Sequence, residues 1–146
     1  MTSKVFNLSA WSAYGIVQIF GKQDDAPWEW GDNLRYTTTP GSITVVVAEE
    51  SDQFPVEIQV GTCSGLRGMK ILECVLEIDE RGVEIAHARS AGEQLERGII
   101  GCMIPVPWSG SVCVRVFSSS VDMQSEPPNL PTGLIVCIER MENVGP

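Results

Sequence analysis

The sequence predicts an all-β fold, an antiparallel β-sandwich of about eight strands joined by long polar loops. Short apolar or alternating segments recur along the chain, and residues typical of turns separate them. These segments arrive at intervals typical of a sandwich and not of a sheet built from βαβ units. The chain has 146 residues, the size of one domain, and no repeat or linker divides it. We therefore expect a single domain over residues 1–146.

Alternation identifies most of the strands. Val56, Ile58 and Val60 share one face of a segment whose other face carries Glu57 and Gln59. Residues 69–78 and 112–117 alternate in the same way, whereas residues 43–48 are apolar on both faces, as in a buried central strand. The eight strands are expected at residues 14–20, 43–48, 55–60, 69–78, 83–88, 99–106, 112–117 and 134–139.

Turn residues define the connections. The segment Asp79-Glu-Arg-Gly82 is predicted to be a hairpin turn, with Gly82 where a positive φ is needed. Residues 118–132 contain Pro127, Pro128 and Pro131, which favours a long loop and excludes a central strand.

The acidic composition restricts the possible partners. Nineteen acidic residues against ten basic ones give a net charge of −9, which disfavours direct binding to nucleic acid phosphates and to anionic membranes. The N-terminal residues contain no apolar run of signal-peptide length, and no apolar stretch could span a bilayer. We therefore expect a cytoplasmic protein without membrane contact.

The five cysteines form no motif. Their number is odd and no pair has C-x-x-C spacing. Cys74, Cys113 and Cys137 lie within apolar runs and are expected to be small core residues in a reducing cytosol. Cys63 lies in a turn-like stretch, so we expect it to be the most exposed of the five.

No residues indicate catalysis. The single histidine, His87, is expected to be a core or rim residue, and no nucleophile elbow, phosphate-binding loop or metal-ligand spacing accompanies it. Three pairs of adjacent carboxylates are expected to lie in turns and to face water: Asp24-Asp25, Glu49-Glu50 and Asp79-Glu80. We therefore predict no catalytic residue, no metal site and no cofactor, and a protein that is not an enzyme.

A segment rich in tryptophan and acidic residues is the strongest candidate binding site. Residues 22–36 contain two of the four tryptophans, four carboxylates and a tyrosine. Aromatic side chains anchor protein interfaces, and carboxylates steer a basic partner. The alternative is that both tryptophans only close one end of the sandwich. The predicted partner-binding residues are Asp24, Asp25, Trp28, Glu29, Trp30 and Asp32.

The same part of the chain carries a family resemblance. The progression Val17-Gln-Ile-Phe20, Lys22-Gln-Asp24, Pro27, Trp30-Gly-Asp32, Tyr36 and Gly41-Ser-Ile43 resembles the N-terminal half of the competence protein J family. That family consists of small acidic cytoplasmic proteins that inhibit a DNA-entry nuclease. The resemblance implies an inhibitor or immunity protein that presents carboxylates to the basic groove of a nuclease.

Two other functions remain open. Exposed Trp11, Trp28, Trp30 and Trp108 could stack on sugar rings in a carbohydrate-binding or small-ligand-binding sandwich. An exposed sheet edge could instead pair with other copies in a self-assembling structural component.

Overall fold

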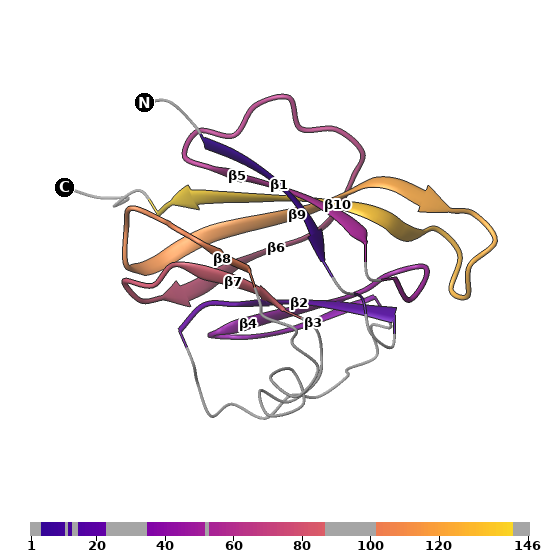
Figure 1. Cartoon of the computed structure of the whole chain (residues 1–146), viewed down its shortest axis with the longest axis horizontal. Coiled ribbons are helices and arrows are strands. Elements are labelled where there is room, and N and C mark those ends of the chain that lie inside the picture. The colour runs from indigo at the N-terminus through magenta and orange to yellow at the C-terminus, as the bar shows by residue number, and fades with distance from the viewer. Residues whose placement is uncertain are drawn as a thin grey trace.

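Two five-stranded sheets pack face to face in the computed structural model, which describes residues 4–10, 12, 15–22, 35–51, 53–86 and 102–141 (Figure 1). Sheet A has the order β1-β5-β10-β9-β6, and sheet B has the order β3-β4-β2-β7-β8. Sheet A consists of β1 (Lys4–Ala10), β5 (Phe54–Val60), β6 (Met69–Ile78), β9 (Gly110–Asp122) and β10 (Leu130–Arg140). Sheet B consists of β2 (Ile16–Phe20), β3 (Tyr36–Thr39), β4 (Ser42–Val46), β7 (Val83–Ala86) and β8 (Cys102–Ile104). The predicted all-β fold is confirmed.

The core lies between the two sheets and follows from strand alternation. Sheet A contributes inward side chains such as Ile58, Leu76 and Val114, and sheet B contributes Ile19 and Ile43. All five are completely buried. Burying each such aliphatic side chain contributes about 1.5–3 kcal/mol, so these positions fix which face of each sheet points inward.

The predicted strand positions are confirmed, and two strands were not predicted. Each of the eight predicted segments contains a strand of the structure, but β1 and β3 were missed. Both lie at sheet edges. Their side chains are mostly half-buried or exposed, so they carry little of the apolar signal that identifies a strand.

The predicted loop over residues 118–132 is wrong. Strand β9 continues to Asp122 and β10 begins at Leu130, and together they form the long hairpin that projects from the sandwich in Figure 1. The prolines are accommodated because Pro127 and Pro128 lie between the two strands. Pro131 lies where the β9–β10 register shifts, so an irregular ladder tolerates its missing N–H. The sandwich is also not purely antiparallel, because β5 and β10 pair in parallel.

The predicted tight turn at residues 79–82 is present, with the Gly82 N–H donating to the Asp79 carbonyl (3.1 Å), but it does not join the paired strands of a β-hairpin. It follows β6 of sheet A and precedes β7 of sheet B, so it passes the chain from one sheet to the other. Gly82 has a φ of +92°, as predicted. Within the described part of the chain, no helix is long and apolar enough to cross a membrane.

Candidate protein-binding surface

The predicted partner-binding residues all lie outside the described residues, which leave out residues 23–34. A role in partner binding therefore stays a prediction for these residues, which are Asp24, Asp25, Trp28, Glu29, Trp30 and Asp32. Lys22 and Arg35, the described residues next to this undescribed range, are held in place. The Lys22 backbone N–H donates to the Glu77 carbonyl (2.6 Å), and the Arg35 guanidinium donates to the Pro128 carbonyl (2.8 Å). Because β2 and β3 run in the same direction, these two anchors lie at opposite ends of sheet B.

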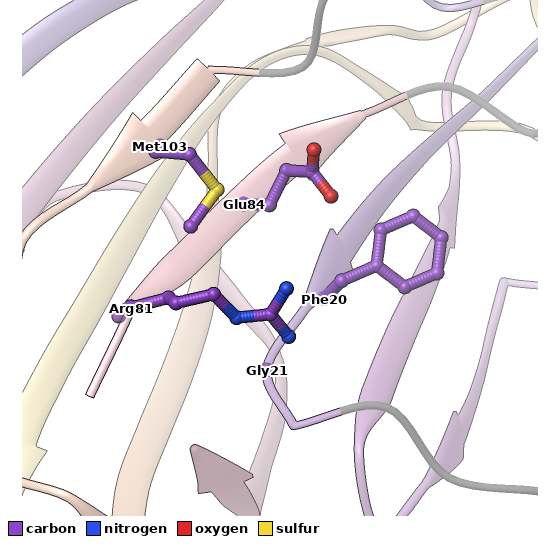
Figure 2. Close-up of a pocket in the computed structure, with 6 residues that line it drawn as sticks. Phe20, Gly21, Arg81, Glu84 and Met103 are labelled. Carbon is purple, nitrogen blue, oxygen red and sulfur yellow. The ribbon is translucent and has the colours of Figure 1, made fainter. Parts of the chain in front are cut away.

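A pocket of about 450 Å³ opens where β2 ends and the predicted segment begins (Figure 2). Its walls come from three strands of sheet B and from the turn before β7. The lining residues are Phe20, Gly21, Arg81, Gly82, Glu84 and Met103.

Strand register brings three of these side chains into one row. Phe20 of β2 is paired with Glu84 of β7, and Glu84 is paired with Met103 of β8. Their neighbours along each strand point into the core, so these three point outward. Figure 2 shows the Glu84 carboxylate between the Phe20 ring and the Met103 thioether. The row thus places one carboxylate between two apolar groups.

Negative charges outnumber positive charges around the pocket. The Arg81 guanidinium donates to the Asp79 carboxylate, with Nη2 3.0 Å from Oδ2 and Nε 3.3 Å from Oδ1. These hydrogen bonds hold the pKa of the Asp79 carboxyl below its usual value and raise the pKa of Arg81. Glu84 and the exposed Glu80 make no ion pair among the described residues. The pocket and its rim are therefore net acidic.

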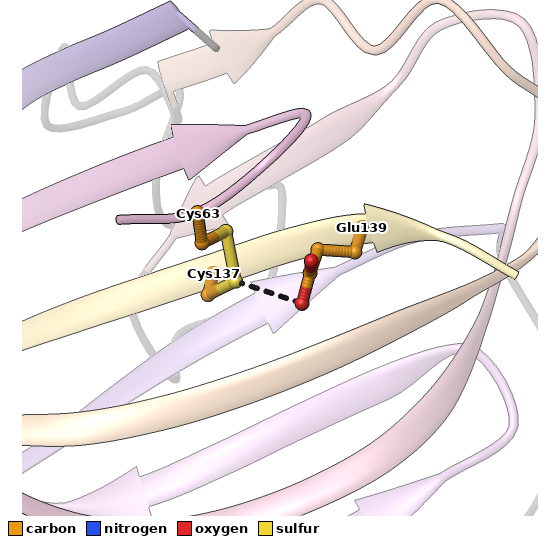
Figure 3. A group of neighbouring side chains, drawn as sticks. All are labelled: Cys63, Cys137 and Glu139. Carbon is orange, nitrogen blue, oxygen red and sulfur yellow. Dashed lines mark hydrogen bonds between the residues drawn. A yellow bond between two sulfur atoms is a disulfide. The ribbon is translucent and has the colours of Figure 1, made fainter. Parts of the chain in front are cut away.

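The prediction of core cysteines is wrong for Cys113, which is only half-buried, and it did not include a disulfide. Cys63 and Cys137, 74 residues apart, form a disulfide (Figure 3). Cys137 is completely buried, as predicted for an apolar run, but it lies on the outer face of sheet A and beneath the β5–β6 connection that carries Cys63. No local spacing signals this pairing, because it joins two distant segments across the sheet.

The disulfide is one of several interactions that hold this connection, residues 61–68, against sheet A, and the Gly61 backbone N–H donates to the Ile138 carbonyl (3.0 Å). The Ser64 backbone N–H donates to Gln59 Oε1 (3.0 Å), and Arg67 forms an ion pair with Glu57 (3.6 Å). Glu139 lies close to the disulfide, with its Oε1 3.5 Å from Cys137 Sγ, and pairs with Arg115. Two thiolates and a carboxylate would be metal ligands, but the two sulfurs are bonded to each other and offer no thiolate.

The remaining candidates fall into three groups. His87 and Trp11 lie outside the described residues. Trp108 is half-buried against the core and lines a pocket of about 200 Å³ with Pro105 and Pro107. Glu49 and Glu50 are exposed, as expected for a solvated turn.

Cys74 and Cys113 are free thiols on neighbouring strands. Burial raises the pKa of the Cys74 thiol to about 11, with smaller contributions from Cys113 and Glu73. The pKa of Cys113 is raised mainly by burial as well. Neither thiol is activated as a nucleophile, because a reactive cysteine needs a lowered pKa.

Comparison with known proteins gives one relationship. No family model and no curated protein sequence matches the chain. Among solved structures, the chain is similar to "ComJ, inhibitor of the DNA degrading activity of NucA, from Bacillus subtilis". The match has a TM-score of 0.63 and 14% sequence identity, and it covers 96% of this chain and 98% of ComJ. This chain has the fold of ComJ.

The similarity confirms the resemblance to the competence protein J family at the level of fold, over almost the whole chain and not only its N-terminal third. The neighbour is an inhibitor and not an enzyme, in agreement with the sequence prediction. The pocket residues Phe20, Glu84 and Met103 were not predicted from the sequence. Alternation could have placed the first two on an outer face, but their pairing across three strands is not encoded locally.

Proposed function

We propose that this protein binds a nuclease and inhibits its degradation of DNA. The observation that carries the proposal is the similarity in fold to ComJ along the full length of both chains. A nuclease that acts on DNA needs a basic surface to bind phosphates. A small protein with a net charge of −9 is suited to such a surface, because opposite charge accelerates association and orients the partners.

The contact residues in this proposal are those predicted from the sequence. Asp24, Asp25, Glu29 and Asp32 would pair with lysine or arginine side chains of the nuclease. Trp28 and Trp30 would pack at the centre, where exclusion of water gives aromatic residues their large share of binding energy. Lys22 and Arg35, the described residues next to the contact residues on either side, are held by hydrogen bonds, so these two residues lose less entropy on binding.

The first test captures the partner by charge. The tagged protein is immobilised, exposed to lysate of its host at low salt and eluted with a salt gradient, and each fraction is assayed for degradation of plasmid DNA. We expect a nuclease that elutes at moderate salt and is inhibited when the free protein is added back. Fractions without nuclease activity, or a captured nuclease that the added protein does not slow, would contradict the proposal. Purified NucA serves as a defined second target.

A pair of double variants then tests the segment. Asp24→Asn with Asp25→Asn should slow association about tenfold and flatten its salt dependence, because steering charges act mainly on the association rate. The matched control is Glu49→Gln with Glu50→Gln, which removes the same charge from a turn that the proposal does not use. Equal effects of both double variants would show that only net charge matters.

The cytoplasmic location is also a proposal, and the disulfide provides its test. Cytosolic glutathione and thioredoxin keep thiols reduced. In cells quenched rapidly in acid and alkylated, a cytoplasmic protein should carry Cys63 and Cys137 as thiols, which oxidise to the disulfide after purification in air. A pair that is oxidised in quenched cells would contradict a cytoplasmic location.

A further inference from the structure

The pocket at the end of β2 has a chemistry that selects its occupant. Glu84 lies at its centre and is half-buried between Phe20 and Met103 (Figure 2). Among the described residues it has neither a hydrogen-bond donor nor an ion-pair partner. No described donor contacts this half-buried carboxylate, so a group that supplies both a hydrogen-bond donor and a positive charge gains more here than at a fully exposed carboxylate.

The cation already present does not fill this role. Arg81 lines the pocket and its charge attracts Glu84 from beyond ion-pair distance. Its guanidinium is hydrogen-bonded to Asp79 through two of its nitrogens, and 63% of its side chain is exposed. The exposed Glu80 adds a further negative charge at the rim. The site therefore disfavours an anion. A purely apolar ligand would bury Glu84 without a partner, and a metal ion would find only one free carboxylate among the lining residues.

The walls fit a cation carried on an apolar stem. The Met103 thioether and the Phe20 ring flank the carboxylate and can pack against methylene groups, and an aromatic face also attracts a cation. The pocket is accessible from the side, because Met103 is 45% exposed and lies on β8, the short edge strand of sheet B. Gly21 of the pocket directly precedes Lys22, the first residue of the predicted binding segment.

We propose that this pocket receives one arginine or lysine side chain from the basic surface of a protein partner, with the charge on Glu84 and the aliphatic stem between Phe20 and Met103. The proposal deepens the proposed function, on which it rests for the identity of the partner. It adds an anchor on sheet B to the contacts proposed for Asp24, Asp25, Trp28, Glu29, Trp30 and Asp32.

The direct test uses a small probe. N-acetyl-arginine methylamide is titrated into the protein at constant ionic strength, and backbone amide signals are followed by NMR. The uncharged comparison is N-acetyl-citrulline methylamide, which has nearly the same shape. We expect saturable shifts at Gly21, Gly82 and Glu84 with the arginine probe, and about tenfold weaker binding both of the citrulline probe and of arginine to Glu84→Gln. The control Glu73→Gln, which changes an exposed carboxylate on sheet A, should bind arginine like the wild type.

The same variants are then compared as nuclease inhibitors. Glu84→Gln should raise the concentration needed for half-inhibition about tenfold, and Glu73→Gln should not. The proposal would be overturned if the arginine probe caused no shifts at the pocket or if the arginine and citrulline probes bound equally well. It would also be overturned if Glu84→Gln and Glu73→Gln lost the same amount of inhibition. Arginine binding at the pocket without inhibition of any nuclease would refute the proposed function and leave the pocket standing. If the wild-type protein inhibits a nuclease, but free arginine and Glu84→Gln leave that inhibition unchanged, the pocket proposal is refuted and the proposed function stands.

Discussion

Breaking the Cys63–Cys137 disulfide should destabilise the protein strongly. The bond closes a loop of 74 residues, and the chain-entropy relation assigns such a cross-link about 4 kcal/mol through its restriction of the unfolded state. The variant of choice is Cys63→Ser, because Cys63 is half-exposed and a serine hydroxyl there is within reach of water, whereas Cys137 is completely buried. For a chain of this length, that loss corresponds to a melting temperature lower by roughly 10–15 °C.

The assay is urea unfolding of the wild type with and without a dithiol reductant, beside Cys63→Ser. Reduced wild type and Cys63→Ser should agree, and both should show a steeper denaturant dependence because an unfolded chain without the cross-link exposes more surface. Cys113→Ser is the control, because Cys113 is a free, half-exposed thiol on the same face of sheet A, and it should change the free energy of unfolding by no more than about 0.5 kcal/mol. A Cys63→Ser variant as stable as the oxidised wild type would refute the reasoning.

Two further outcomes follow from local geometry. Gly82→Ala should destabilise by about 2 kcal/mol or more in thermal unfolding, because Gly82 has a φ of +92° and an added Cβ would lie 2.2 Å from the Ile104 carbonyl oxygen. Gly65→Ala, with a φ of +63° and open space around the Cβ, should cost only about 1 kcal/mol, and equal costs would contradict the clash. The pKa of Cys74, about 11 against an ordinary 9.0, means that the folded protein keeps this proton longer than the unfolded chain. The free energy of unfolding should therefore fall as pH rises from about 9 to about 11, more in the wild type than in Cys74→Ala, and alkylation of Cys74 should stay slow below pH 10. Rapid alkylation of Cys74 at pH 8 would contradict the raised pKa.

The strands that the sequence predicts are those with a buried face. Residues 55–60 and 69–78 alternate because one side of each strand packs in the core, and the structure places strands there. The edge strand β3, Tyr36–Thr39, has little buried surface and gave no such pattern. The prediction of a loop at residues 118–132 was wrong because it relied on the prolines. A proline is excluded from a strand only where its backbone N–H would have to donate a hydrogen bond between strands, and the sequence does not specify those positions.

The candidate site was predictable only in part. The clustering of Trp28, Trp30 and the nearby carboxylates is visible because these residues are adjacent in the chain. The pocket is not, because Phe20, Glu84 and Met103 come from three strands whose pairing depends on the whole sheet. The same holds for Cys63 and Cys137, which meet only because residues 61–68 cross the outer face of sheet A.

The sequence by itself determined the all-β class, the approximate strand positions, the inward face of most strands and the acidic character of the protein. These properties depend on composition and on periodicity over a few residues, which each segment carries alone. The tertiary structure decided the strand order, the parallel pairing of β5 with β10, the disulfide and the pocket around Glu84. Each of these joins residues that are distant in the chain, and many pairings would bury the same apolar faces almost equally well, so only packing of all ten strands together selects one.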